Sequence, residues 1–326
     1  MSWMVIVTQV LLPVLLLLWF ALFPAAGVLA LGLQALSVGA VLLGLGLTAL
    51  WAMPPFWVPY LYGVVFLMIA AWHLLKGRFL GNGLWRATAG PTTLVLLAFG
   101  LGLMGGYMGY LGLLGRELPK VETVDIAPPF GAGTYLVAHG GSNNLVNIHL
   151  HTLDESVERF RPWRGQSRAL DIFRTTPFGR HVDGWQPVDP ARYVTFGTPV
   201  LAPCSGEVAR VVGGVKDMQV PQMDREHMAG NYVAVDCGDF FVVLAHLRQG
   251  SIEVRAGDRL DTGDRLGEMG NSGNSSEPHL HVHAQRGLPE GAPLSGKPLA
   301  LTINGDFYVR NDRIIAPDPR AAPAQL

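Results

Sequence analysis

The chain has 326 residues, of which 49% are hydrophobic and 15% are charged, and its 24 Lys and Arg nearly balance its 25 Asp and Glu. This composition is too apolar for an ordinary soluble protein. Residues 1–115 contain no Asp or Glu and only three basic residues, Lys76, Arg78 and Arg86. The remainder is polar and slightly acidic, which gives no reason to expect nucleic-acid binding. A membrane part followed by a globular part is therefore predicted.

Four long apolar runs predict four transmembrane helices in residues 1–115. They cover residues 3–23, 28–52, 56–75 and 92–114, and each can cross a bilayer core of about 30 Å at about 1.5 Å per residue. A signal peptide would give one short run instead of four long ones. The only basic loop lies between the third and fourth runs, and such loops stay in the cytoplasm. The globular part is then expected on the outer side of the membrane.

The fourth run contains two pairs of glycines spaced by four residues, Gly102 with Gly106 and Gly105 with Gly109. This spacing lets helix backbones approach closely in lipid. We interpret it as packing inside this bundle, and a dimer or another helix partner is the alternative. The spans contain no Asp, Glu, Lys or Arg, whereas transport pathways usually need such groups. The bundle is expected to be an anchor or docking module that contacts the lipid bilayer.

The rest of the chain predicts a juxtamembrane linker (116–134), a mostly antiparallel β domain (135–316) and a flexible tail (317–326). Mixed charges, adjacent prolines and a small-residue turn mark the linker. Short apolar runs separated by Gly-Asp and Gly-Asn turns mark the β domain. The proline- and alanine-rich composition of the last ten residues is typical of disorder.

The stretch GNSGNSSEPHLHVHAQ (270–285) carries the strongest chemical signal. His279, His281 and His283 alternate with apolar residues, which predicts a β-strand with all three imidazoles on one face. Zn²⁺ favours nitrogen ligands in tetrahedral geometry, so this face is a candidate metal site. The last of the three, His283, either supports a ligand from outside the metal coordination or forms a wall of the groove, and we interpret it as a groove wall.

Three further candidates lie upstream of this stretch. His149 alternates with Asn147 and His151 in a segment that is also interpreted as a strand. Asp171 is an acidic residue in the apolar pattern ALDIF, where burial is costly unless the group is paired or binds a cation. His246 ends the apolar strand FFVVLAHL; by itself such a histidine is more often a hydrogen-bonded core residue.

The order of these motifs resembles the lysostaphin-type (LytM-like) zinc metallopeptidases of bacterial cell walls. The resemblance covers residues 135–285 and rests on FGTPVLAPCSGEV, GNYVAV, AHLRQGSIEVRAGD and GNSGNSSEPHLHVH. It implies that His281 is a zinc ligand, that His279 is a catalytic histidine beside the zinc, and that His246 is the second catalytic histidine. The family's early H-x-G-x-D motif is missing here, because Ser167 stands four residues before Asp171.

A variant of the family with N-x-H and a separate A-L-D-I is similar to this chain and implies His149 and Asp171 as the other two ligands. His151 is the rival of His149 on the predicted strand. A third choice is His181 with Asp183 or Asp189, although no family motif surrounds it. Under this resemblance the chain binds one zinc ion.

The resemblance implies a membrane-anchored zinc endopeptidase that cuts peptide bonds of peptidoglycan. It would lie in the bacterial inner membrane, with the C-terminal domain in the periplasm or outside the cell. The alternatives are a non-catalytic module that binds or regulates cell-wall hydrolases, and a protease of exported proteins. The two cysteines, Cys204 and Cys237, would form a disulfide in such a compartment or remain buried thiols.

Overall fold

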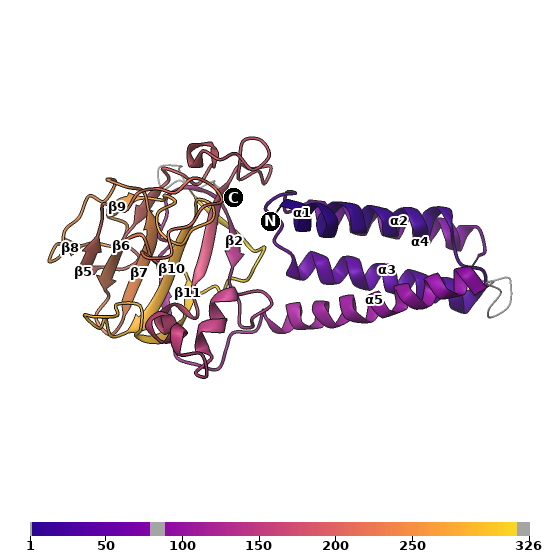
Figure 1. Cartoon of the computed structure of the whole chain (residues 1–326), viewed down its shortest axis with the longest axis horizontal. Coiled ribbons are helices and arrows are strands. Elements are labelled where there is room, and N and C mark those ends of the chain that lie inside the picture. Colours follow the sequence, from indigo (N-terminus) through magenta and orange to yellow (C-terminus); the bar gives the residue numbers. More distant parts are fainter. Residues whose placement is uncertain (1, 79–88, 318–326) are drawn as a thin grey trace, which may run out of the picture. The chain divides into compact units, whose positions relative to one another are not determined.

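The computed structural model describes residues 2–78 and 89–317. It divides into two compact units, Met1–Leu114 and Gly115–Leu326, which are described separately. Figure 1 follows the chain through both units from indigo to yellow. Arg86 of the predicted basic loop lies outside the described residues, and so does the predicted tail after Pro317.

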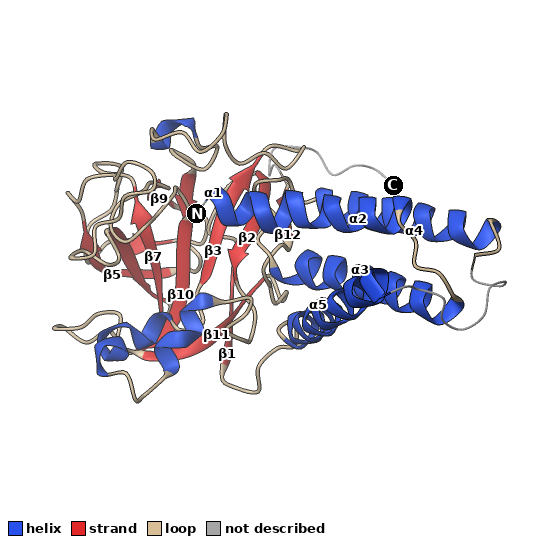
Figure 2. Cartoon of the chain, turned by 45° about the vertical axis from the view of Figure 1, so that its right-hand side comes forward, coloured by secondary structure: helices blue, strands red, loops and turns tan. Residues whose placement is uncertain are grey.

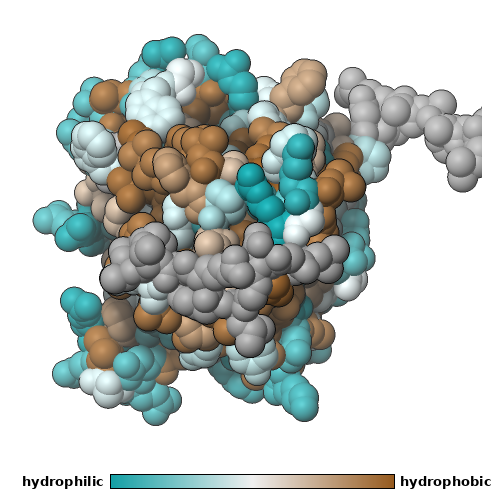
Figure 3. All heavy atoms as spheres, turned by 90° about the vertical axis from the view of Figure 1, so that its right-hand side faces the viewer, coloured by the Kyte–Doolittle hydropathy of each residue, from teal (hydrophilic) through white to brown (hydrophobic). Residues whose placement is uncertain are grey.

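Four helical runs that are long and apolar enough to cross a membrane make up the first unit (Figures 1 and 2), which confirms the prediction. The first run changes its hydrogen bonding midway, because a π-helical segment separates two α-helices. Large apolar side chains such as Leu15, Leu36 and Leu67 are exposed on these helices, and hydrophobic residues occupy much of the face in Figure 3. This surface suits lipid better than water. The bounds are α1 (Ser2–Val5), η1 (Ile6–Leu11), α2 (Leu12–Leu22), α3 (Val28–Thr48), α4 (Val58–Leu75) and α5 (Ala89–Leu114).

The glycines of α5 pack directly against α3. A Cβ on Gly102 would lie 2.6 Å from the Cα of Ser37, and a Cβ on Gly105 would lie 2.6 Å from the Cα of Val41. On the other helix, a Cβ on Gly44 would lie 2.3 Å from the carbonyl oxygen of Gly105. Only glycine permits such distances between backbones, so the first glycine of each pair, Gly102 and Gly105, serves a contact inside the bundle.

The second unit is built on one large sheet with strand order β12-β2-β3-β10-β7-β6-β5-β8, in which β11 also pairs with β10 and β1 pairs with β11. A separate pair joins β4 and β9. All of these pairings are antiparallel except β1–β11, which confirms the predicted fold class. The bounds are β1 (Thr123–Ile126), β2 (Gly133–His139), η2 (Ile148–Leu153), η3 (Glu158–Gln166), β3 (Leu170–Thr175), η4 (Pro190–Arg192), β4 (Pro199–Leu201), β5 (Gly206–Val212), β6 (Asn231–Asp236), β7 (Phe241–Leu247), β8 (Arg259–Leu260), β9 (Arg265–Glu268), β10 (Leu280–Arg286), β11 (Lys297–Ile303) and β12 (Arg313–Ala316).

Alternation along β10 separates the hydrophobic core from the polar residues of the site. Leu280, Val282 and Ala284 enter the main core together with the inward residues of β2, β3, β6 and β7. The intervening residues of a strand point to the opposite face, and here they are His281, His283 and Gln285. Because β10 pairs with β3, β7 and β11, this polar face lies in the interior of the sheet and not at its edge.

Two features of the second unit bear on the earlier expectations. β1 lies within the segment predicted as a linker and pairs with β11, so part of that segment belongs to the sheet. Cys204 and Cys237 form a disulfide across 33 residues, and no free cysteine remains in the described chain. Of the two alternatives for these cysteines, the disulfide is therefore confirmed, and the pair of buried thiols is wrong.

Candidate active site

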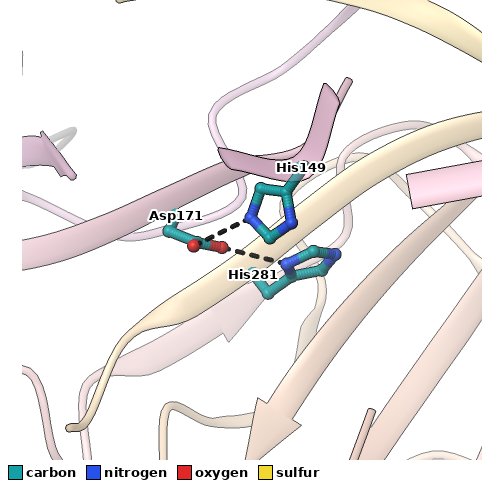
Figure 4. Close-up of side chains that lie close together, drawn as sticks. All are labelled: His149, Asp171 and His281. Atoms are coloured by element: carbon teal, nitrogen blue, oxygen red, sulfur yellow. Dashed lines mark hydrogen bonds and ion pairs between the residues drawn. The ribbon is translucent and has the colours of Figure 1, made fainter. Parts of the chain in front are cut away.

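His149, Asp171 and His281 form a compact group whose ligand atoms lie within 4.8 Å of one another. Figure 4 shows the Asp171 carboxylate beside the two imidazoles, with a dashed line from it to each ring. His149 Nε2 is 2.9 Å from Asp171 Oδ2, and His281 Nδ1 is 2.9 Å from Asp171 Oδ1. Two ring nitrogens and one carboxylate oxygen are a donor set that suits a transition-metal ion. The residues present therefore fit a metal site.

The sheet register brings Asp171 and His281 together. Asp171 on β3 is the direct antiparallel partner of His281 on β10, so their side chains project side by side from one face. On its other side Asp171 faces His139 of β2, where the pairing shifts by one residue between Val137 and His139. Such bulges re-aim side chains and are common beside active sites.

His149 reaches the group from a 3-10 helix, η2, and not from a strand. The interpretation of residues 147–151 as a strand is therefore wrong. The cause is Asn147, whose Oδ1 accepts a hydrogen bond from the His149 N–H at 3.2 Å and so caps the helix. The Asn147 amide also donates to the carbonyls of Ala169 (3.0 Å) and Gly141 (3.3 Å). Asn147 thus ties the helix to the residues just before β3.

The rivals of His149 lie elsewhere. His151 is exposed and stands outside the group of donor atoms. Ser167, at the position where the family's common motif has histidine, hydrogen-bonds the Thr152 hydroxyl at 2.7 Å. His181 pairs with Glu277 at 3.2 Å and stacks on Phe173. The structure therefore places neither His151 nor His181 among the candidate ligands.

His246 and His279 flank the group. Their ring centroids are 4.7 Å apart, and that of His246 is 5.7 Å from that of His281. His246 Nδ1 is 2.8 Å from the Ser272 carbonyl oxygen, and His279 Nδ1 is 2.9 Å from the Glu277 carbonyl oxygen. A carbonyl only accepts, so both Nδ1 atoms donate, and each ring keeps its Nε2 for other contacts.

The backbone of His246 is unusual. The pairing of β7 with β6 shifts by one residue next to His246, and His246 itself has φ of 61°. A non-glycine residue in this left-handed region is uncommon and is found more often at functional sites. The bulge turns His246 away from the regular alternation of β7, an orientation that a strand pattern alone does not predict.

Charges in the site oppose one another. Burial acts to raise the pKa of Asp171, but His149 and His279 outweigh it and hold that pKa well below its usual range. Burial acts to lower the pKa of His279, but Asp171 outweighs it and the pKa is raised. For His246, burial and then the neighbouring His279 and His281 lower the pKa well below its usual value. The two flanking histidines are therefore shifted in opposite directions.

Two further histidines contribute to the site: His139, which no motif in the sequence reveals, and His283 of the histidine strand motif. His139 makes an edge contact with His149, with centroids 5.9 Å apart, and its Nδ1 accepts from Arg310 Nη2 at 2.8 Å. The prediction that His283 is a groove wall is wrong, and the alternative, a residue that supports a ligand, agrees with its position. His283 is 1% exposed and its Nδ1 is 3.1 Å from His281 Nε2.

A model of a known protein family matches part of this chain. Residues 192–294 match the model of peptidase family M23. This confirms, over that range, the lysostaphin-type resemblance expected from the motifs. The range contains His246, His279 and His281, whereas His149 and Asp171 precede it.

Two known proteins and a solved structure are similar to this chain. The chain is 31% identical over 197 residues to the peptidoglycan DD-endopeptidase ShyA of Vibrio cholerae, which covers 59% of this chain and 42% of that protein. It is also 31% identical over 181 residues to an uncharacterized metalloprotease of Haemophilus influenzae, covering 53% of this chain and 33% of the relative. The chain thus spans less than half of the length of either relative. The catalytic domain of lysostaphin from Staphylococcus simulans aligns with a TM-score of 0.26 and 20% identity, over 38% of this chain and 71% of that one.

Proposed function

We propose that this protein is a membrane-anchored zinc endopeptidase that hydrolyses peptide bonds in bacterial peptidoglycan. The observation that carries the proposal is the group of His149, Asp171 and His281 with two further histidines beside it. The match to the M23 model and the similarity to the Vibrio cholerae peptidoglycan DD-endopeptidase support the class of substrate. One zinc ion per chain would be held by the three grouped residues.

The flanking residues supply the proton transfers. A zinc ion held by two imidazoles and a carboxylate would polarise a scissile carbonyl and lower the pKa of water near it. His246 donates its Nδ1 proton to Ser272, so its Nε2 lone pair is available to accept a proton from the attacking water. His279 is oriented by the Glu277 carbonyl and would donate from Nε2 to the developing oxyanion, a contribution of roughly 3 kcal/mol for comparable donors.

The membrane part supports the proposed location. Four apolar helices fit a multi-pass anchor. Basic loops stay in the cytoplasm, so the loop after α4 would lie on that side of the membrane and the β domain would face the periplasm or the exterior. The disulfide between Cys204 and Cys237 gives independent support, since such bonds persist in oxidising compartments. The peptidoglycan substrate lies on the same side.

The test uses the full chain in detergent, purified sacculi and mass spectrometry of the released fragments. His281→Ala should lose bound zinc and hydrolysis together. His246→Ala should keep its zinc and lose about 100- to 10,000-fold in rate. His151→Ala is the control, because His151 is exposed and outside the group, and it should behave as wild type. Muropeptide binding without hydrolysis would indicate a regulatory module, and cleavage confined to a protein panel would indicate a protease of exported proteins; either result would overturn the proposal.

A further inference from the structure

A buried line of polar side chains runs along β10 behind the candidate ligand His281. His281, His283 and Gln285 are 3%, 1% and 0% exposed, and as alternate residues of one strand they share a face. His281 Nε2 is 3.1 Å from His283 Nδ1, and His283 Nε2 is 3.3 Å from Gln285 Oε1. The line therefore connects the ligand to an amide two side chains away.

At the far end of the line, the orientation of the Gln285 side-chain amide is fixed. Gln285 Nε2 lies 2.7 Å from the carbonyl oxygens of Gly287 and of Pro293. Carbonyl oxygens only accept, so the NH₂ group must face them and Oε1 must face His283. The direction of the amide is thus set by backbone groups outside the site.

The orientation of the Gln285 amide determines which ring nitrogen of His283, and then of His281, carries a proton. Gln285 Oε1 only accepts, so His283 Nε2 carries a proton and donates it. A second proton on His283 would be a buried charge, and no carboxylate hydrogen-bonds to His283 in the described part of the chain. Its Nδ1 is therefore a lone pair that accepts from His281 Nε2–H. A neutral His281 is then left with a lone pair on Nδ1.

That lone pair points at an acceptor. His281 Nδ1 is 2.9 Å from the Asp171 carboxylate oxygen, and two acceptors at that distance repel unless a positive species lies between them. The opposite tautomer of His281 would donate from Nδ1 to Asp171 and satisfy both groups without any metal. The line on β10 disfavours this tautomer, because it would leave His281 Nε2 and His283 Nδ1 as facing acceptors.

The space around Gln285 is shaped to keep the amide in place. A Cβ on Gly165 would lie 1.9 Å from Gln285 Oε1, and a Cβ on Gly296 would lie 2.7 Å from Gln285 Nε2. Gly165 belongs to η3 and its N–H donates to the Leu294 carbonyl at 2.7 Å. The 3-10 segment that follows the His149 helix therefore also confines the end of the line.

We propose that His283 and Gln285 are positioning residues that hold His281 in the Nε2–H tautomer and so commit its Nδ1 lone pair to a cation. This inference rests on the proposed metal site and deepens it. Hydrogen bonds from the second ring nitrogen of a ligating histidine orient the ring and increase its basicity, and removing the partner typically costs about 10- to 100-fold in metal affinity. Here the partner is a neutral histidine and not a carboxylate.

The test compares His283→Phe, which has no acceptor, with His283→Gln, which can accept from His281 and donate to Gln285. Zinc affinity of the full chain in detergent is measured by competition with a chromophoric chelator. His283→Phe should bind about 10- to 100-fold more weakly, and His283→Gln should recover most of the loss. Val282→Ala, on the opposite face of β10, is the control for general loss of packing and should keep wild-type affinity.

A second readout does not need metal or activity. In the metal-free chain labelled with ¹⁵N-histidine, long-range NMR correlations should show His281 protonated on Nε2, and this pattern should change in His283→Phe and in Gln285→Met. If His281 is protonated on Nδ1 in the wild type, or if His283→Phe binds zinc as tightly as His283→Gln, the inference is overturned while the metal site stands. If His281 has the Nε2–H tautomer but the wild type binds no zinc, the proposed function falls, and of the inference only the effect of His283 and Gln285 on the His281 tautomer remains.

Discussion

Replacing Asn147 by alanine tests whether one side chain holds the helix that carries His149. Asn147 is 1% exposed; it caps η2 and donates to the buried carbonyls of Gly141 and Ala169. Loss of a cap costs about 1 kcal/mol, and each carbonyl left without a donor costs about 1–3 kcal/mol. The substitution should therefore destabilise the placement of η2 by at least about 3 kcal/mol.

This local cost becomes a loss of zinc affinity, because metal binding must restore the helix before His149 can act as a ligand. About 3 kcal/mol corresponds to roughly 100-fold weaker binding, measured by chelator competition on the full chain. Hydrogen exchange of the peptide spanning 148–166 should be faster in the metal-free Asn147→Ala variant, and zinc should slow it again.

The matched control is Asn231→Ala. Asn231 is also fully buried and makes three comparable hydrogen bonds, to both backbone groups of Val215 and to the Leu247 carbonyl, but none involves a segment that bears a candidate ligand. It should lower the free energy of unfolding and leave zinc affinity unchanged. The reasoning fails if both variants weaken zinc binding alike, or if Asn147→Ala binds zinc as wild type does.

Two further predictions concern acid stability and the membrane bundle. Burial is the largest influence on His139 and lowers its pKa to about 3, against 6.5 for an exposed histidine. Between these two pH values the unfolded chain binds a proton at this residue and the folded chain does not. The free energy of unfolding therefore falls with falling pH by about 1.4 kcal/mol per pH unit. His139→Gln should remove this contribution to the pH dependence of the free energy of unfolding, measured by urea unfolding with pulse proteolysis as the readout at about pH 6 and about pH 4. An unchanged pH dependence would contradict the low pKa of His139. In the bundle, Gly105→Ala should lower the thermal unfolding midpoint in detergent because its Cβ meets the α3 backbone, whereas Gly100→Ala, with nothing within 4 Å, should not. Equal midpoints would show that the close approach of α3 and α5 is dispensable.

The sequence predicts best where local pattern and structure coincide. The alternation around His281 follows the period of a strand, and the turn before it fixes where β10 begins. Asp171 is recognisable because an acidic residue in an apolar strand needs a partner. The four membrane helices follow from length and hydropathy alone.

The remaining features depend on contacts distant in the sequence. Residues around His149 alternate like a strand, but Asn147 caps a 3-10 helix there instead, and its bond to Ala169, 22 residues away, holds that helix in place. His283 shares the pattern of His281, and only the cover provided by η3 and the neighbouring strands decides that it is buried. β1 looks like a linker because its partner β11 joins it from the other end of the domain. Sequence periodicity contains none of this information.

The disulfide has a topological consequence for the site. Cys204 and Cys237 close a loop of 33 residues that lies wholly between Asp171 and His281, which are 110 residues apart. In the unfolded chain this cross-link shortens the path between the two candidate ligands by less than a third. Loop-closure entropy grows only with the logarithm of length, so the gain is about 0.3 kcal/mol. The disulfide and the proposed metal ion therefore contribute almost independently to the stability of this domain. If the metal site is as proposed, the destabilisation by a reductant and that by a chelator should simply add.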